Sequence, residues 1–217
     1  MPSSAGIAAS RCAIDAIVDG DGTLSCAHAA ALCTSAADTR DLADAVHALC
    51  QLHGSAPSII ALAAGSGSAD SVAPWLAEAA AAFDHERAIL ATLTAAVGPL
   101  PSTPRHAQAE AAINAQRHAL GTLAQSSRAG CASGAALAFL LDWHAIRHVL
   151  AMAAQRSGVA LLPVELPART AIIAIAQSVA ATPSHARALA FGAQQLALQH
   201  HGLWQLLAAR AEARAAL

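Results

Sequence analysis

One stretch near the middle of the chain constrains the fold more than any other. Residues 137–150 are apolar on nearly every side of a helical wheel, and with Ala136 they read A-L-A-F-L-L-D-W-H-A-I-R-H-V-L. A helix that is apolar all round lies in the centre of a larger protein, and any polar groups on it need partners inside the fold. We therefore predict a central buried helix whose polar members deserve scrutiny: Asp142, His144, Arg147 and His148.

The remaining sequence predicts an all-α protein. Hydrophobic residues make up 56% of the 217, but the excess is alanine, which favours helix and adds little apolar area. Aromatic residues make up only 3%, and no segment alternates as a strand would. We expect an up-down antiparallel bundle of four long helices, with short N-terminal and connecting helices. The long helices are predicted at 71–97, 104–129, 131–157 (or from Ser133) and 184–214, and the short ones at 7–18, 23–33, 38–52, 57–64 and 168–181.

We expect a single all-helical domain over residues 1–217, because this length suits one sizeable core. The sequence Gly65-Ser66-Gly67-Ser68 is the clearest flexible connection in the chain. It separates an N-terminal helical appendage, residues 1–64, from a main bundle, residues 69–217.

Several classes of function are not indicated. The net charge is −2 and the basic residues, all Arg, form no stripe, so we expect no nucleic-acid partner. The sequence holds no G-x-S-x-G, no glycine-rich phosphate loop and no Cys–His pair at a helix start, so we lean away from an enzyme. We expect no signal peptide, and because the apolar run 129–141 is too short to span a membrane we expect no membrane partner. Five cysteines without a C-x-x-C pair favour the cytoplasm.

An acidic turn near the N-terminus invites a calcium interpretation. Residues 19–22 read D-G-D-G, but a helix–loop–helix calcium site needs Gly at its sixth position and Glu at its twelfth. Those positions hold Leu24 and Ala30. We predict instead a turn followed by Thr23 as a helix N-cap.

A second N-terminal pattern begins in the helix predicted at 38–52, where five polar residues recur at every third position. The steps of three drift around the helix, so the five positions spread over roughly 240° and do not share a face. We expect Cys50 and His53 near the buried face, with Asp44 and His47 pointing away from it. A helix with an acidic first turn explains the pattern better than a metal site does. The five residues are Asp41, Asp44, His47, Cys50 and His53.

A central polar layer is predicted in the main bundle. Four polar residues fall on apolar arcs near the middles of their helices, and helix middles share one level in an antiparallel bundle. Asp142 is turned roughly 120–160° away from the His144–His148 pair, so it should face a different neighbour. The layer consists of Glu86, His144, His148 and His200.

Three interpretations of this layer stay open. The groups pair with one another, for example Glu86 with Arg147, and fix the helix register. Alternatively, a ferritin-like bundle holds a single transition-metal ion through Glu86, His144, His148 and His200. A third interpretation is a small apolar ligand pocket lined by large side chains. Without a ligand, these side chains would fill the space that the many small alanines leave in the core. That pocket would be lined by Phe139, Trp143, Met152 and Trp204.

The sequence thus predicts a helical binding, interaction or structural module, with a metal-binding bundle as the alternative. The C-terminal helix carries apolar residues away from its main buried stripe, so the N-terminal helices or a second subunit should cover that face. The residues are Phe191, Leu198 and Leu206.

Overall fold

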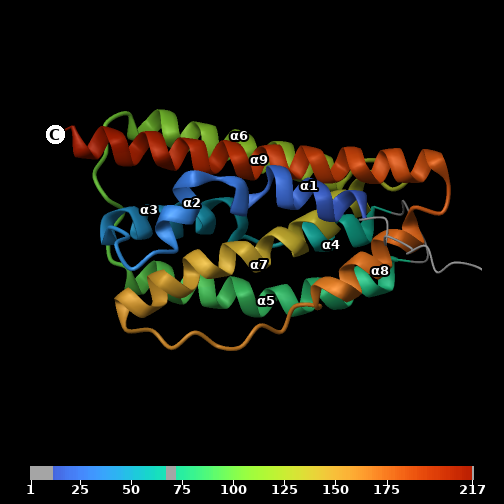
Figure 1. Ribbon diagram of the computed structural model, residues 1–217, viewed down its shortest axis with the longest axis horizontal. Coiled ribbons are helices and arrows are strands. Elements are labelled where there is room, and N and C mark those ends of the chain that lie inside the picture. Colours follow the sequence, from blue (N-terminus) through green and yellow to red (C-terminus); the bar gives the residue numbers. More distant parts are fainter. Residues whose placement is uncertain (1–11, 67–71, 217) are drawn as a thin grey trace, which may run out of the picture.

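The computed structural model describes residues 12–66 and 72–216, and within them every regular element is helical. This confirms the all-α prediction. Figure 1 shows the four longest helices with their axes along the long dimension of the molecule, and the shorter helices lie among them. The elements are α1 (Ala13–Asp21), the 3-10 turn η1 (Thr23–Ser25), α2 (Ala27–Leu32), α3 (Thr39–His53), α4 (Ile59–Gly65), α5 (Ala73–Ala96), α6 (His106–Ala124), α7 (Cys131–Ser157), α8 (Arg169–Val179) and α9 (Pro183–Ala215).

The predicted helix boundaries agree with the structure to within a few residues at most positions. The predicted helix 23–33 is an exception, because it divides into η1 and α2 at Cys26. The last long helix begins before its predicted start at Ser184: the hydroxyl of Thr182 caps α9 by accepting from the His185 N–H. The predicted positions 7–11, 67–68 and 71 lie outside the described residues.

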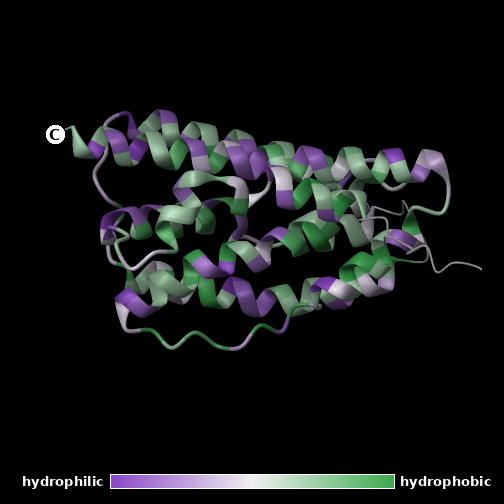
Figure 2. Cartoon of the chain, in the orientation of Figure 1, coloured by the Kyte–Doolittle hydropathy of each residue, from purple (hydrophilic) through white to green (hydrophobic). Residues whose placement is uncertain are grey.

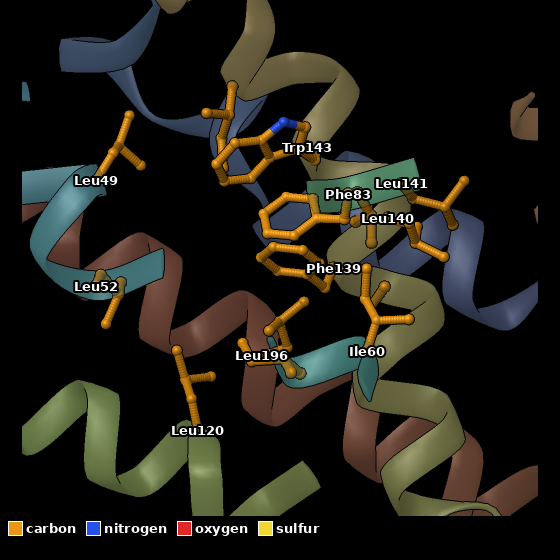
Figure 3. Packing of buried hydrophobic residues seen from close by; sticks show 14 of the residues in the cluster. Leu49, Leu52, Ile60, Phe83, Leu120, Phe139, Leu140, Leu141, Trp143 and Leu196 are labelled. Carbon is orange, nitrogen blue, oxygen red and sulfur yellow. The ribbon is translucent and has the colours of Figure 1, made fainter. Parts of the chain in front are cut away.

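Helix α7 is the centre of the molecule. Twenty of its residues are buried, and its most extensive packing contact is with α9. Its rings gather with those of α5: the centroid of Phe83 lies 4.9 Å from that of Phe139 and 4.8 Å from that of Trp143 (Figure 3). Leucines of α3, α6 and α9 surround this aromatic centre, so that α7 is covered on nearly all sides.

Two glycines allow α7 and α9 to approach closely. A Cβ atom on Gly134 would lie 2.1 Å from the Leu189 carbonyl oxygen, and one on Gly192 would lie 2.0 Å from that of Cys131. Both contacts are with backbone, which cannot move aside as a flexible side chain can. The closest part of the α7–α9 interface therefore requires glycine on both helices.

The N-terminal helices share the core of the main bundle. Leu42 and Leu49 of α3 and Ile60 of α4 are fully buried in the same apolar cluster as α5, α7 and α9. Helices α1 and α2 pack on α9, but they leave Phe191 and Leu198 of its second apolar face exposed. The segment predicted as an appendage therefore contributes to the central core.

Helix α7 is the one described helix whose length and composition would suit a membrane span. However, 78% of its most apolar window is buried inside the protein. Core helices of soluble proteins have this character, because their apolar surface faces other helices. The burial of α7 fits that explanation.

Candidate functional site

A pocket of about 370 Å³ lies beside the middle of α7, and we refer to it as the α7 pocket. Its walls come from the end of α1, η1, one side of α7, the start of α8 and the irregular connection 158–168. In Figure 1 this connection runs along the outer edge of the molecule, and Figure 2 shows that it is mostly apolar. The lining residues are Val18, Asp19, Leu24, Leu141, Asp142, His144, Ala145, Arg147, His148, Ala151, Leu161, Val164 and Arg169.

Two side chains of α7 hold the connection in place over the pocket. Arg147 Nη2 donates to the carbonyl oxygen of Leu162. His144 Nε2 lies 3.0 Å from the carbonyl oxygen of Pro167. Because a carbonyl can only accept, Nε2 carries the proton, and Nδ1 of a neutral His144 is left as an acceptor. The polar residues of the central helix thus fix the wall that closes one side of the pocket.

Arg147 is itself fixed by a buried ion pair with Glu86. Its Nη1 donates to Glu86 Oε1, and Trp143 Nε1 donates to Glu86 Oε2 at 3.0 Å. Glu86 is 1% exposed and Arg147 is 6% exposed, so solvent has little access to either charge. A buried charge of this kind is stable only with its partner present. This pair is the arrangement that the first interpretation of the polar layer predicted.

Asp142 organises a second buried network on another side of α7. Its carboxylate accepts from the Thr23 N–H at 2.8 Å, from the Thr23 hydroxyl at 2.7 Å and from His200 Nδ1 at 2.6 Å. The Thr23 hydroxyl in turn accepts from Trp204 Nε1 at 2.9 Å. Gly22 makes this approach possible, because a Cβ there would lie 2.6 Å from Asp142 Oδ1. Thr23 is therefore a tertiary partner of Asp142 and not the predicted helix cap.

The predicted metal layer is not assembled in the structure. Among the described residues no group of three or more His, Cys, Asp or Glu is placed to hold a metal ion. Glu86 is engaged by Arg147 and Trp143, His144 by Pro167, and His200 by Asp142. His148 is exposed at the mouth of the α7 pocket instead of buried. The wheel angles located the polar faces, but they assigned His200 to the wrong partner.

The four residues predicted to line an apolar pocket do not come together around the α7 pocket. Phe139 and Trp143 contact each other with centroids 5.4 Å apart, and Trp204 bonds to Thr23. Met152 is only partly buried at the edge of the core. None of the four lines the α7 pocket.

The predicted outward orientation of Asp44 is wrong. Asp44 is 1% exposed, and it receives Arg210 Nε at 2.9 Å and Arg214 Nη1 at 2.6 Å. Arg214 also reaches the Asp41 carboxylate and the Thr103 hydroxyl, which joins α3 to the end of α9. Each Asp faces an Arg, so this network is a structural clamp with its charges paired.

A cysteine and a histidine also meet, but they do not form a reactive pair. Cys26 Sγ lies 3.3 Å from His201 Nδ1. Burial raises the pKa of the Cys26 thiol, and the nearby Asp142 carboxylate raises it further. A nucleophilic cysteine requires a lowered pKa, so Cys26 stays protonated and inert at neutral pH.

Comparison with known proteins places the chain in a family without giving it an activity. Residues 18–215 match a family of unknown function (DUF6975). The chain belongs to this family. No curated protein and no solved structure matches it. The matched segment begins within α1 and ends within α9, so it includes the α7 pocket and both buried networks.

Two members of the site, Arg169 and Thr23, could not be identified from the sequence pattern. Arg169 begins α8, and its Nη2 lies 2.7 Å from Asp15 and 2.6 Å from Asp19 on α1. Thr23 lies 119 positions before its partner Asp142. Such distant partners leave no periodic signal, and only the D-G-D-G turn marked this region as unusual.

Proposed function

We propose that this family member is a binding module, and that its ligand is a small, mostly apolar molecule held in the α7 pocket. One observation carries the proposal: polar side chains from α1, α7 and α8 converge on a pocket whose other walls are apolar. A volume of about 370 Å³ lies within the usual range for small-molecule sites, roughly 300–1,000 Å³. Apolar walls supply binding energy, and a few placed polar groups orient the ligand.

Two histidines of α7 offer polar atoms to such a ligand. Nδ1 of a neutral His144 is an acceptor, because Nε2 donates to Pro167, and the side chain of His148 is exposed. The apolar surface comes from Leu141, Leu161 and Val164. Val164 is 43% exposed, and a bound ligand would cover apolar surface that now faces solvent.

Blocking the pocket with one exposed substitution tests the proposal. Ala151 lines the pocket and is exposed, so Ala151→Trp fills the mouth without entering the core. The probe is Nile red, a neutral apolar dye whose fluorescence rises on leaving water. We expect saturable binding that Ala151→Trp weakens at least about tenfold, equal to about 1.4 kcal/mol. Ala111→Trp, at an exposed alanine of α6, is the matched control and should bind the dye as the unchanged protein does.

Two further parts of the proposal concern the setting of the protein. We propose that it acts in the cytoplasm, which the five free thiols support. We also propose self-association through α9, supported by Phe191 and Leu198, which are 48% and 50% exposed. Sedimentation of Phe191→Ser beside the unchanged chain tests the second point, and a concentration-independent monomer mass for the unchanged chain contradicts it.

A further inference from the structure

Helix α9 presents one straight outward face along most of its length, and we refer to it as the α9 face. In Figure 1 this helix runs along one edge of the molecule, with α6 beside it. At 100° per residue the positions of the face fall within an arc of roughly 80°. Five of them are exposed and the sixth, Gly202, is half-buried. The α9 face consists of Phe191, Gln194, Leu198, Gly202, Gln205 and Ala209.

The two halves of the α9 face have complementary shapes. The first half carries two large apolar side chains, Phe191 and Leu198, which are 48% and 50% exposed. The second half carries small residues at nearly the same angles, Gly202 and Ala209. Ala209 also lines a groove of about 580 Å³ between the end of α9 and the start of α6. The first half therefore projects from the molecule, and the second half is hollow.

Two copies of this face fit each other when their helices run antiparallel. A twofold axis perpendicular to both helices relates each position to one equally far on the other side of the axis, so that the contact is isologous. An axis beside residue 200 places Phe191 of one copy opposite Ala209 of the other, and Leu198 opposite Gly202. A parallel pair would place each projecting side chain against its own copy and would leave the hollow halves facing each other.

The charges at the two ends of the α9 face favour the same arrangement. Arg187 and Glu212 are exposed, and neither forms an ion pair within the residues that the structure describes. They lie about 20° apart on the helical wheel, and their midpoint falls between residues 199 and 200. Arg128, whose guanidinium lies 5.8 Å from the Phe191 ring centroid, adds positive charge beside the first half. An antiparallel pair brings opposite charges together at both ends, whereas a parallel pair brings like charges together.

We propose that two copies of this chain pair through the α9 face, with their α9 helices antiparallel about a twofold axis beside residue 200. Phe191 and Leu198 of each copy pack against the small residues of the other, and Arg187 of each copy pairs with Glu212 of the other. This pairing rests on the self-association through α9 proposed above, and it adds the geometry. An isologous contact of this kind closes on itself, so assembly stops at two copies.

Disulfide cross-linking of the full chain tests the antiparallel arrangement. Gln194 and Gln205 are exposed and lie opposite each other across the proposed axis. Within one copy, and between like positions of an antiparallel pair, these sites are at least about 16 Å apart, which no disulfide spans. The double variant Gln194→Cys/Gln205→Cys should therefore form a covalent dimer on mild oxidation, with mass spectrometry showing a 194–205 link. Neither single variant should link through its new cysteine, and the unchanged chain with its five free cysteines is the control.

Charge reversal tests the ends of the face. Sedimentation equilibrium measures the dissociation constant of the dimer. Arg187→Glu should weaken the dimer at least about tenfold, because it replaces two attractive contacts by two repulsive ones. Glu212→Arg should do the same, and the two substitutions together should restore the dissociation constant to within about threefold of that of the unchanged chain. Arg117→Glu, at an exposed position of α6, changes the net charge equally and should leave the dimer unaffected.

The possible failures of this pairing are distinguishable. A concentration-independent monomer mass for the unchanged chain overturns the self-association and the pairing with it. A dimer in which a single cysteine variant links to itself overturns the antiparallel pairing alone. So does a dimer whose stability the combined charge reversal does not restore.

Discussion

The Glu86–Arg147 pair allows the sharpest prediction about what holds this fold together. Both side chains are almost fully buried, and each is the other's charge partner. Unit charges about 4 Å apart interact by about 4 kcal/mol at an effective dielectric constant of about 20. Removing one member of a buried pair also leaves the other charge without its partner, and such changes cost about 3–5 kcal/mol. We therefore expect Glu86→Gln to lower the free energy of unfolding by about 3 kcal/mol, the lower end because Gln keeps one acceptor for Trp143 or Arg147.

The double variant distinguishes a buried pair from two independent losses. Arg147→Met alone should also cost about 3 kcal/mol, because it isolates the Glu86 charge. Glu86→Gln with Arg147→Met leaves no buried charge, so the double variant should cost about 3 kcal/mol and not about 6. The coupling energy is then about 3 kcal/mol. Urea unfolding followed by far-UV circular dichroism measures all of these differences.

The same helix supplies a matched control. Arg87 Nη2 lies 2.6 Å from Asp84 Oδ1, but the Asp84 side chain is 58% exposed. Water screens that pair, so Asp84→Asn should cost less than about 0.5 kcal/mol. The reasoning is refuted if Glu86→Gln costs no more than Asp84→Asn, or if the effects of the Glu86 and Arg147 substitutions simply add.

Two further predictions concern the helix interface and acid stability. Gly192→Ala should destabilise the protein by about 1–3 kcal/mol, because the new Cβ would meet the Cys131 carbonyl. Gly121→Ala has open space around it and should stabilise α6 by about 0.5–1 kcal/mol. Equal effects of the two substitutions on urea unfolding would contradict this prediction. Below about pH 6.5 the unfolded chain takes up a proton at His53, whereas the folded chain does not, because burial lowers the pKa of this ring. The contribution of His53 to stability is therefore fully present above that pH. It falls by up to about 1.4 kcal/mol per pH unit as the pH decreases toward the lowered pKa of His53 in the folded chain. In carboxylate-free buffer, His53→Phe should flatten this slope and His118→Gln should not; an unchanged slope in the His53 variant would show that the ring is not protected from protons.

The outcome for individual residues shows where sequence reasoning about this chain succeeded. Helix α7 was predicted from its apolar character on every side, and it is the most buried element. Glu86 was predicted on a buried arc of α5 with Arg147 as one of its possible partners, and in the structure it is buried and paired with Arg147. Wheel angles succeeded here because they depend only on the helical repeat. They could not give the order in which neighbours surround α7, so His200 was assigned to the His144 face although it bonds to Asp142.

The sequence by itself therefore determined that this chain is helical, which helix lies at its centre, and that polar groups on that helix need partners. These follow from propensity and periodicity, which are local properties. Only the tertiary structure decided which partners those are: Thr23 for Asp142, the 158–168 connection for His144 and Arg147, and Arg210 for Asp44. The physical reason is that a buried polar group accepts any neighbour that satisfies it, and the path of the chain decides which neighbour arrives.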